Sequence, residues 1–182
     1  MNYVEYLHDF DQISQLKSEL FQLLEKLNLN KPQIGPGPIW QIGLTSLDGD
    51  PDDWRSTWRE KLKYNERYYS TLNKSLQGTI FEDIIQQYSK YYRWRLLNVK
   101  GNKTYTVHED GPKNKRIHIP ITTNNQCFLC FYDNIPVHES INKVYHYHLE
   151  VGKVYEIDSS GYHTAVNYGD EDRWHLVGVR QD

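Results

Sequence analysis

Residues 153–167 read KVYEIDSSGYHTAVN, and this stretch determines how the rest of the chain is interpreted. Its first six residues mix branched, aromatic and polar side chains as a half-buried strand does, and the polar run from Asp158 to Gly161 is typical of a tight turn. A second strand then opens with His163. The sequence therefore predicts two strands joined by a turn, with a histidine at the start of the second.

Similar short segments fill the second half of the chain. They are separated by turn residues such as KGNK, EDGPKNK, TNN and YGDED. Strands are expected at 92–99, 104–109, 115–122, 126–132, 143–150, 153–158, 163–168 and 173–179. This number and spacing of strands predicts an antiparallel sandwich or barrel.

The first half is expected to be mainly helical. Apolar residues recur in three- and four-residue steps over residues 10–27, which predicts an amphipathic helix with one buried face. The members of this face are Phe10, Ile13, Leu16, Leu20, Leu23, Leu24 and Leu27. A short strand is expected at 39–46 and a second helix around 80–90. We expect one domain over 1–182, with a helical wrapping at 1–90 and a β-barrel core at 91–182.

Composition restricts the class of protein. The chain has 182 residues, a formal charge of -3 and two cysteines, and neither a signal peptide nor a membrane-length apolar run is evident. We expect a cytoplasmic protein with no nucleic-acid or membrane partner. The basic and aromatic run YSKYYRWR (88–95) is interpreted as a helix-to-strand junction with a solvated face. Cys127 and Cys130 are interpreted as ordinary apolar side chains.

Two predicted strands direct an arginine and a histidine to one face. In residues 116–121, Arg116 and His118 alternate with three isoleucines. In residues 173–178, Arg173 and His175 share a face in the same way. Each such face is either solvated or part of a binding site.

The position of Arg173 favours the interpretation of this face as part of a binding site. Arg173 follows His163 by ten residues and lies in a segment that reads as buried strand. A guanidinium group is costly to bury unless an anion meets it there. A neighbouring carboxylate or a ligand must supply that anion.

The segments RIHIPITTN, HLEVGKVYEID, HTAVN and DRWHLVG, in this order, resemble the aspartyl/asparaginyl β-hydroxylase family of Fe(II)- and 2-oxoglutarate-dependent oxygenases. Residues 152–167 also resemble the second sequence motif of cupins. This resemblance implies a mainly β fold with a helical N-terminal part, namely a cupin-like double-stranded β-helix (jelly roll).

The same resemblance implies the chemistry of the site. His118 and His163 would bind Fe(II), and Arg173 would bind the distal carboxylate of 2-oxoglutarate, with Arg116 and His175 as further cosubstrate-binding candidates. Most oxygenases of the wider superfamily add a carboxylate two residues after the first histidine, where this chain has Pro120. The resembled family is known for lacking that carboxylate.

The substrate is expected to be an amino acid, a peptide or a related small molecule, hydroxylated with O2. The predicted strand at 126–132 lacks the arginine that the resembled hydroxylases have there, so a peptidyl aspartate or asparagine is not assumed. Gln41 and Asn124 are candidates for substrate binding. His108 and His138 lie in turn-like contexts and have no assigned partner.

Two other functions remain open from the sequence. One is a different metal-dependent cupin enzyme, which would have no use for Arg173. The other is a non-catalytic barrel that binds a small acid or a protein partner, or one that no longer binds iron. Bound metal and dependence on 2-oxoglutarate distinguish these alternatives.

Overall fold

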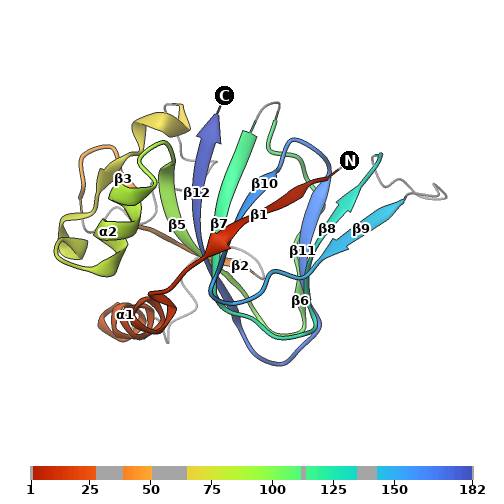
Figure 1. Ribbon diagram of the computed structural model, residues 1–182, viewed down its shortest axis with the longest axis horizontal. Helices are drawn as coiled ribbons and strands as arrows, with labels where there is room; N and C mark the ends of the chain where they lie inside the picture. Colours follow the sequence, from red (N-terminus) through yellow and green to blue (C-terminus); the bar gives the residue numbers. More distant parts are fainter. Residues whose placement is uncertain (1, 28–38, 51–64, 112–113, 135–142, 182) are drawn as a thin grey trace.

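A computed structural model describes residues 2–27, 39–50, 65–111, 114–134 and 143–181 (Figure 1). The helices are α1 (Ile13–Lys26) and α2 (Ile80–Gln87), with 3-10 turns η2 (Glu66–Tyr68) and η3 (Lys74–Leu76). The strands are β1 (Val4–Asp9), β2 (Ile39–Gly43), β3 (Thr45–Ser46), β4 (Thr71–Leu72), β5 (Tyr92–Val99), β6 (Lys103–Thr104), β7 (Asn114–Thr122), β8 (Cys127–Tyr132), β9 (Val144–Tyr147), β10 (Lys153–Asp158), β11 (His163–Asn167) and β12 (Arg173–Gln181).

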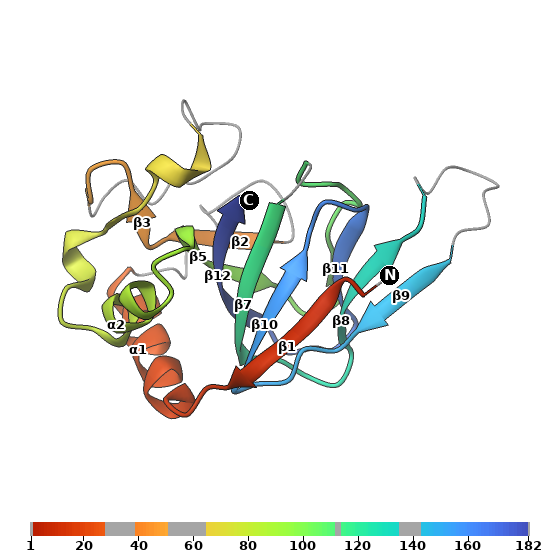
Figure 2. The same ribbon diagram turned by 45° about the horizontal axis from the view of Figure 1, so that its top comes forward.

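Two antiparallel sheets face each other. The larger has six strands in the order β1-β10-β7-β12-β5-β2, and the smaller has four in the order β6-β11-β8-β9. From β5 onward the chain passes from one sheet to the other at every connection except β8 to β9. Figure 2 shows the two sheets splayed apart at one end. This is the jelly-roll arrangement of a double-stranded β-helix, so the predicted fold class is confirmed.

The outer face of the six-stranded sheet packs against the helices, which lie on the side away from the four-stranded sheet (Figure 1). Ile117, Ile119 and Ile121 are fully buried there against α1 and α2. The whole predicted apolar face of the first helix joins the same core. Because side chains alternate along a strand, Arg116 and His118 point to the opposite side, between the sheets.

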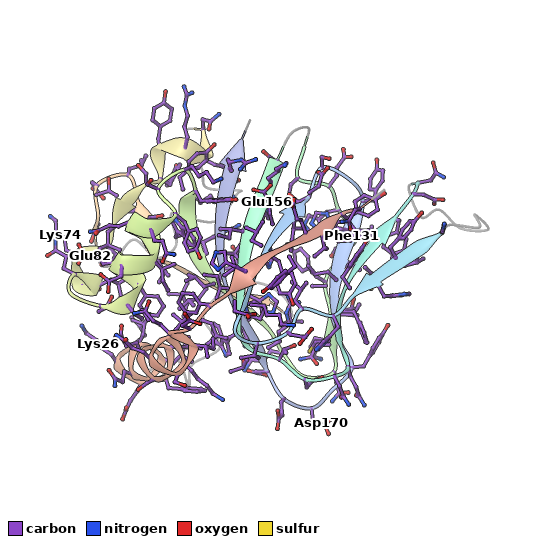
Figure 3. All side chains as sticks on the ribbon, in the orientation of Figure 1. Lys26, Lys74, Glu82, Phe131, Glu156 and Asp170 are labelled. Atoms are coloured by element: carbon purple, nitrogen blue, oxygen red, sulfur yellow. The ribbon has the colours of Figure 1, made fainter. Side chains whose placement is uncertain are left out.

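A smaller aromatic core fills part of the space between the sheets. Tyr3 stacks on Phe131, labelled in Figure 3, with ring centroids 4.5 Å apart. Leu129, Leu149, Tyr155 and Ile157 complete the buried cluster. This cluster closes one region between the sheets and leaves the neighbouring region for polar side chains.

The N-terminal half differs from the expected helical wrapping at β1, which pairs with β10 at one edge of the large sheet. The strand expected at 39–46 is present as β2 and β3, and β2 pairs with β5 at the other edge. Residues 4–9 gave no strand signal because β1 is largely exposed and is held mainly through backbone pairing at an edge. No described helix is long and apolar enough to cross a bilayer.

Candidate metal centre and anion-binding cavity

A cavity of about 290 Å³ lies between the two sheets. The large sheet contributes side chains of β2, β5, β7, β10 and β12, and the small sheet contributes β8 and β11. The segment after β6 closes one side with His108 and Asp110. The polar walls of this cavity contain four arginines, three histidines and one carboxylate, and because the arginines outnumber the carboxylate the cavity is positively charged.

His108, Asp110 and His163 place one ligand-type atom each within 4.8 Å of one another. The Nε2 atom of His163 is 3.6 Å from Oδ2 of Asp110, and Nε2 of His108 is 3.9 Å from Oδ1. The backbones of the two histidines hydrogen-bond each other in an isolated antiparallel bridge. That bridge brings a segment with little regular structure against the start of β11.

Hydrogen bonds orient both imidazoles toward this cluster. The Nδ1 atom of His108 lies 2.9 Å from the carbonyl oxygen of Thr106, and Nδ1 of His163 lies 2.8 Å from that of Gly161. A carbonyl only accepts, so each Nδ1 carries the proton and each Nε2 presents a lone pair. Metal-binding histidines in proteins are held in this way.

The protonation states suit a divalent cation. Burial lowers the pKa of His163 to about 4, so its imidazole is neutral near pH 7. Burial raises the pKa of Asp110, but Arg116, His163 and His108 outweigh it and hold the pKa below its usual value. Two imidazoles and one carboxylate form the donor set of non-heme Fe(II) sites, so these residues fit such a metal.

His118 lies on β7 outside this group of three. It is buried, and its Nδ1 atom is 3.2 Å from Nδ1 of His175. Burial, followed by the charge of Arg173, lowers the pKa of both histidines well below the usual value. The structure therefore joins His163 to His108 and Asp110, and joins His118 to His175.

Arg173 begins β12 and is 4% exposed. Its Nε and Nη2 atoms lie 2.8 and 2.9 Å from the ring nitrogens of His175. Its Nη1 atom is buried and has no hydrogen-bond partner among the residues that the structure describes. Burial lowers its pKa only to about 10, so the side chain remains charged at neutral pH.

Two further arginines reach the cavity from β5. The prediction that residues 88–95 present a solvated face is therefore wrong. Arg93 and Arg95 are 1% and 3% exposed, because alternation along β5 turns both inward while Trp94 packs outward. The helix-to-strand junction itself is present. Arg93 forms an ion pair with Glu66.

Arg95 donates from Nη1 to the side-chain oxygen of Gln41 at 2.9 Å. Its Nε and Nη2 atoms are buried and make no hydrogen bond within the described part of the chain. Burial, followed by the charges of Arg93 and Arg116, lowers the pKa of Arg95 well below its usual value. An anion bound beside Arg95 would stabilise its charged form against burial and against the charges of Arg93 and Arg116.

The other predicted residues are distributed as follows. Gln41 and Arg116 line the cavity, and Arg116 forms an ion pair with Asp110 at 2.6 Å. Asn124 does not line it, because its amide bonds Asn167 and the carbonyl of Glu171. His138 lies outside the described residues.

His108 and Asp110 were not among the site residues predicted from the sequence. The position two residues after His118 is Pro120, whereas a His-x-Asp pattern lies ten residues earlier, at His108. The signal was present as HED (108–110), followed by His163 and Arg173 in the expected order.

Comparison with known proteins supports the fold. No protein-family model matches the chain, and no curated protein matches its sequence. The solved structure of AviO1 from Streptomyces viridochromogenes Tue57 is 12% identical, with a TM-score of 0.57 over 100% of this chain and 90% of that one.

Two enzymes of nogalamycin biosynthesis are also similar. SnoN, a non-heme alpha ketoglutarate dependent epimerase, is 12% identical with a TM-score of 0.53 over 97% of this chain and 78% of its own. SnoK, a carbocyclase with the same dependence, is 11% identical with a TM-score of 0.54 over 97% and 79%. At these identities the likeness shows the shared double-stranded β-helix fold.

Proposed function

We propose that this protein is an Fe(II)- and 2-oxoglutarate-dependent oxygenase whose iron is held by His108, Asp110 and His163. The observation that carries the proposal is the cluster of two oriented imidazoles and a carboxylate in the wall of a cavity that also contains Arg173. This assignment replaces His118 by His108 and adds the carboxylate that the sequence interpretation lacked.

His108, Asp110 and His163 would hold the metal from one wall of the cavity, and the cosubstrate would bind in the cavity beside it. When bound, iron supplies the oxygen activation that no protein side chain can perform. The protein's own part is to hold the ligands, exclude water and fix the cosubstrate. Arg116 maintains the charge of Asp110, and the bonds at Nδ1 keep both Nε2 atoms directed at the metal.

Arg173 is the proposed partner of the distal 2-oxoglutarate carboxylate. Its Nη1 donor is buried and lacks a hydrogen-bond partner in the described residues, which is what an anion subsite in the unliganded protein requires. His175 would then act from behind by fixing the guanidinium plane. The neighbours described as alpha ketoglutarate dependent support this cosubstrate.

The reaction proposed is hydroxylation of an amino acid, peptide or related small molecule. The narrower resemblance to aspartyl/asparaginyl β-hydroxylases is less well supported, because that family lacks the carboxylate that Asp110 provides. The epimerase and the carbocyclase among the structural neighbours are described as alpha ketoglutarate dependent, and their names denote reactions other than hydroxylation. Product analysis with O2 present distinguishes oxygen insertion from these outcomes.

The test is an anaerobic titration of 2-oxoglutarate into Fe(II)-loaded protein, followed by the weak visible charge-transfer band of the chelate. We expect a saturable band in the native protein and in His118→Ala, and loss of bound iron in His108→Ala. Arg173→Ala should keep iron and weaken 2-oxoglutarate binding.

Each other outcome has a defined meaning. Loss of iron in His118→Ala with retention in His108→Ala overturns the assignment of ligands made here. Bound iron without the band favours another metal-dependent cupin chemistry, and absence of bound iron favours a non-catalytic binding barrel.

A further inference from the structure

The cavity contains more positive charge than the proposed metal and cosubstrate neutralise. Arg93 is paired with Glu66, and Arg116 is paired with Asp110. Arg95 and Arg173 have no carboxylate partner among the described residues. A divalent metal and dianionic 2-oxoglutarate cancel each other's charge, so a cationic surplus remains after both have bound.

The two arginines lie far enough apart to serve two ligands. Arg173 on β12 pairs with Val99 on β5, and Arg95 lies four residues further along β5. At about 3.4 Å per residue, their backbone positions are roughly 14 Å apart. Both side chains nevertheless line the same cavity, so the ligand on one arginine would lie within the same enclosed space as the ligand on the other.

The unsatisfied atoms of Arg95 have a specific geometry. Nε and Nη2 are adjacent on one edge of the planar guanidinium, and their N–H bonds run parallel, whereas Nη1 is occupied by Gln41. Such an edge matches the two oxygens of a carboxylate in a bidentate arrangement. The neighbouring guanidinium groups of Arg93 and Arg116 are already engaged, so a third oxygen, as in phosphate, would find no comparable donor.

We propose that the substrate carries a carboxylate that binds side-on to Arg95 beside Gln41, at a subsite separate from that of the cosubstrate. This inference rests on the proposed function, because it assigns 2-oxoglutarate to Arg173. The cavity of about 290 Å³ is at the low end of ligand pockets, which commonly span ~300–1,000 Å³. A small acid, or the acidic end of a larger molecule, fits this space beside the cosubstrate.

The experiment uses the full chain loaded with Zn(II) and saturating 2-oxoglutarate, so that no turnover occurs. Benzoate and indole-3-acetate are titrated by saturation-transfer NMR, with benzamide and indole-3-acetamide as uncharged controls. We expect at least one acid to bind at least ten-fold more tightly than its amide. Arg95→Met should abolish this preference, and Arg95→Lys should weaken it, since lysine keeps the charge but loses the bidentate edge.

The 2-oxoglutarate affinity is measured in the same variants by calorimetry. This affinity should be retained in Arg95→Met and should fall in Arg173→Met. Arg67 lies on an exposed turn, so Arg67→Met should change neither the 2-oxoglutarate affinity nor the affinity for the acids. Equal binding of acids and amides to the native protein overturns the inference. Tighter Arg95-dependent binding of inorganic phosphate overturns the carboxylate assignment.

Two results separate this inference from the proposed function. Loss of 2-oxoglutarate binding in Arg95→Met would make Arg95 the cosubstrate anchor, which overturns the inference and leaves the oxygenase standing. Failure of native protein to bind metal or 2-oxoglutarate, with Arg95-dependent acid binding intact, would remove the oxygenase and retain a carboxylate site.

Discussion

Replacing Arg95 by methionine should stabilise the unliganded protein. The side chain is 3% exposed and carries a charge beside two other arginines, while Nε and Nη2 lack hydrogen-bond partners in the described residues. Methionine keeps an unbranched stem of similar reach and removes the charge and the unsatisfied donors. A residue retained for ligand binding is expected to cost stability when the ligand is absent.

The magnitude follows from the groups involved. Each unsatisfied buried donor costs about 1–3 kcal/mol, and the lost bond to Gln41 contributes about 1 kcal/mol in the other direction. At the lower end of this range, the free energy of unfolding should rise by about 1 kcal/mol, and in the middle of it by about 3 kcal/mol. For a domain of this size, 1 kcal/mol raises Tm by roughly 2–4 °C.

The assay is urea and thermal unfolding of the metal-free protein without added acids. Arg93→Met provides the matched control, because Arg93 lies two residues away on the same strand and is equally buried but has a carboxylate partner. Its loss leaves Glu66 without the guanidinium and should destabilise the protein by about 3–5 kcal/mol. Opposite signs for the two variants support the argument. Destabilisation by Arg95→Met of the same size as by Arg93→Met would refute it.

Two further predictions concern stability. Burial is the largest cause that holds the pKa values of His118 and His175 well below 6.5. Below pH 6.5 the unfolded chain therefore binds more protons at these histidines than the native protein does. The free energy of unfolding should therefore fall as pH drops from 6.5, approaching a slope of about 1.4 kcal/mol per pH unit for each of these histidines. Urea unfolding between pH 7.5 and 5 should show a shallower slope in His118→Asn, and an unchanged slope would contradict the burial of a neutral imidazole. Gly178→Ala should destabilise by about 1–3 kcal/mol, because the added Cβ would lie 2.9 Å from the buried Trp94 ring; thermal unfolding of the double variant with Trp94→Leu should show less than additive loss, and additivity would exclude this contact as the cause.

Much of the fold could be predicted because burial leaves a periodic signal in the sequence. The face of α1 repeats every three or four residues, and the isoleucines of β7 repeat every second residue, because each set covers one continuous surface. β1 lacks such a signal because it is largely exposed at an edge. The segment at 104–109 was expected to be a full strand, but only β6 at 103–104 and a single bridge at His108 are formed.

The candidate site was predictable only where a residue follows a regular strand. His163 and Arg173 each begin a strand after a turn, so local turn and strand signals indicated both as candidate site residues. His108 and Asp110 lie in an irregular segment that tertiary pairing with His163 brings into position, which no local pattern reveals. Alternation along β7 shows which face His118 occupies but not which residue it meets there, and the structure places it beside His175.

The same alternation explains how the protein tolerates its charged interior. The outward residues of β5 and β12 are fully buried and pack into the core that the helices cover. They include Trp94, Leu96 and Leu176. Inward positions of the same two strands hold Arg95, between Trp94 and Leu96, and Arg173, at the start of β12. Each full burial of a large apolar side chain contributes about 1.5–3 kcal/mol, which offsets the cost of an unsatisfied guanidinium on the opposite face of the same strand. The cations are therefore fixed on two adjacent strands whose outer faces are well packed, and the sheet holds both in position for anions before any ligand binds.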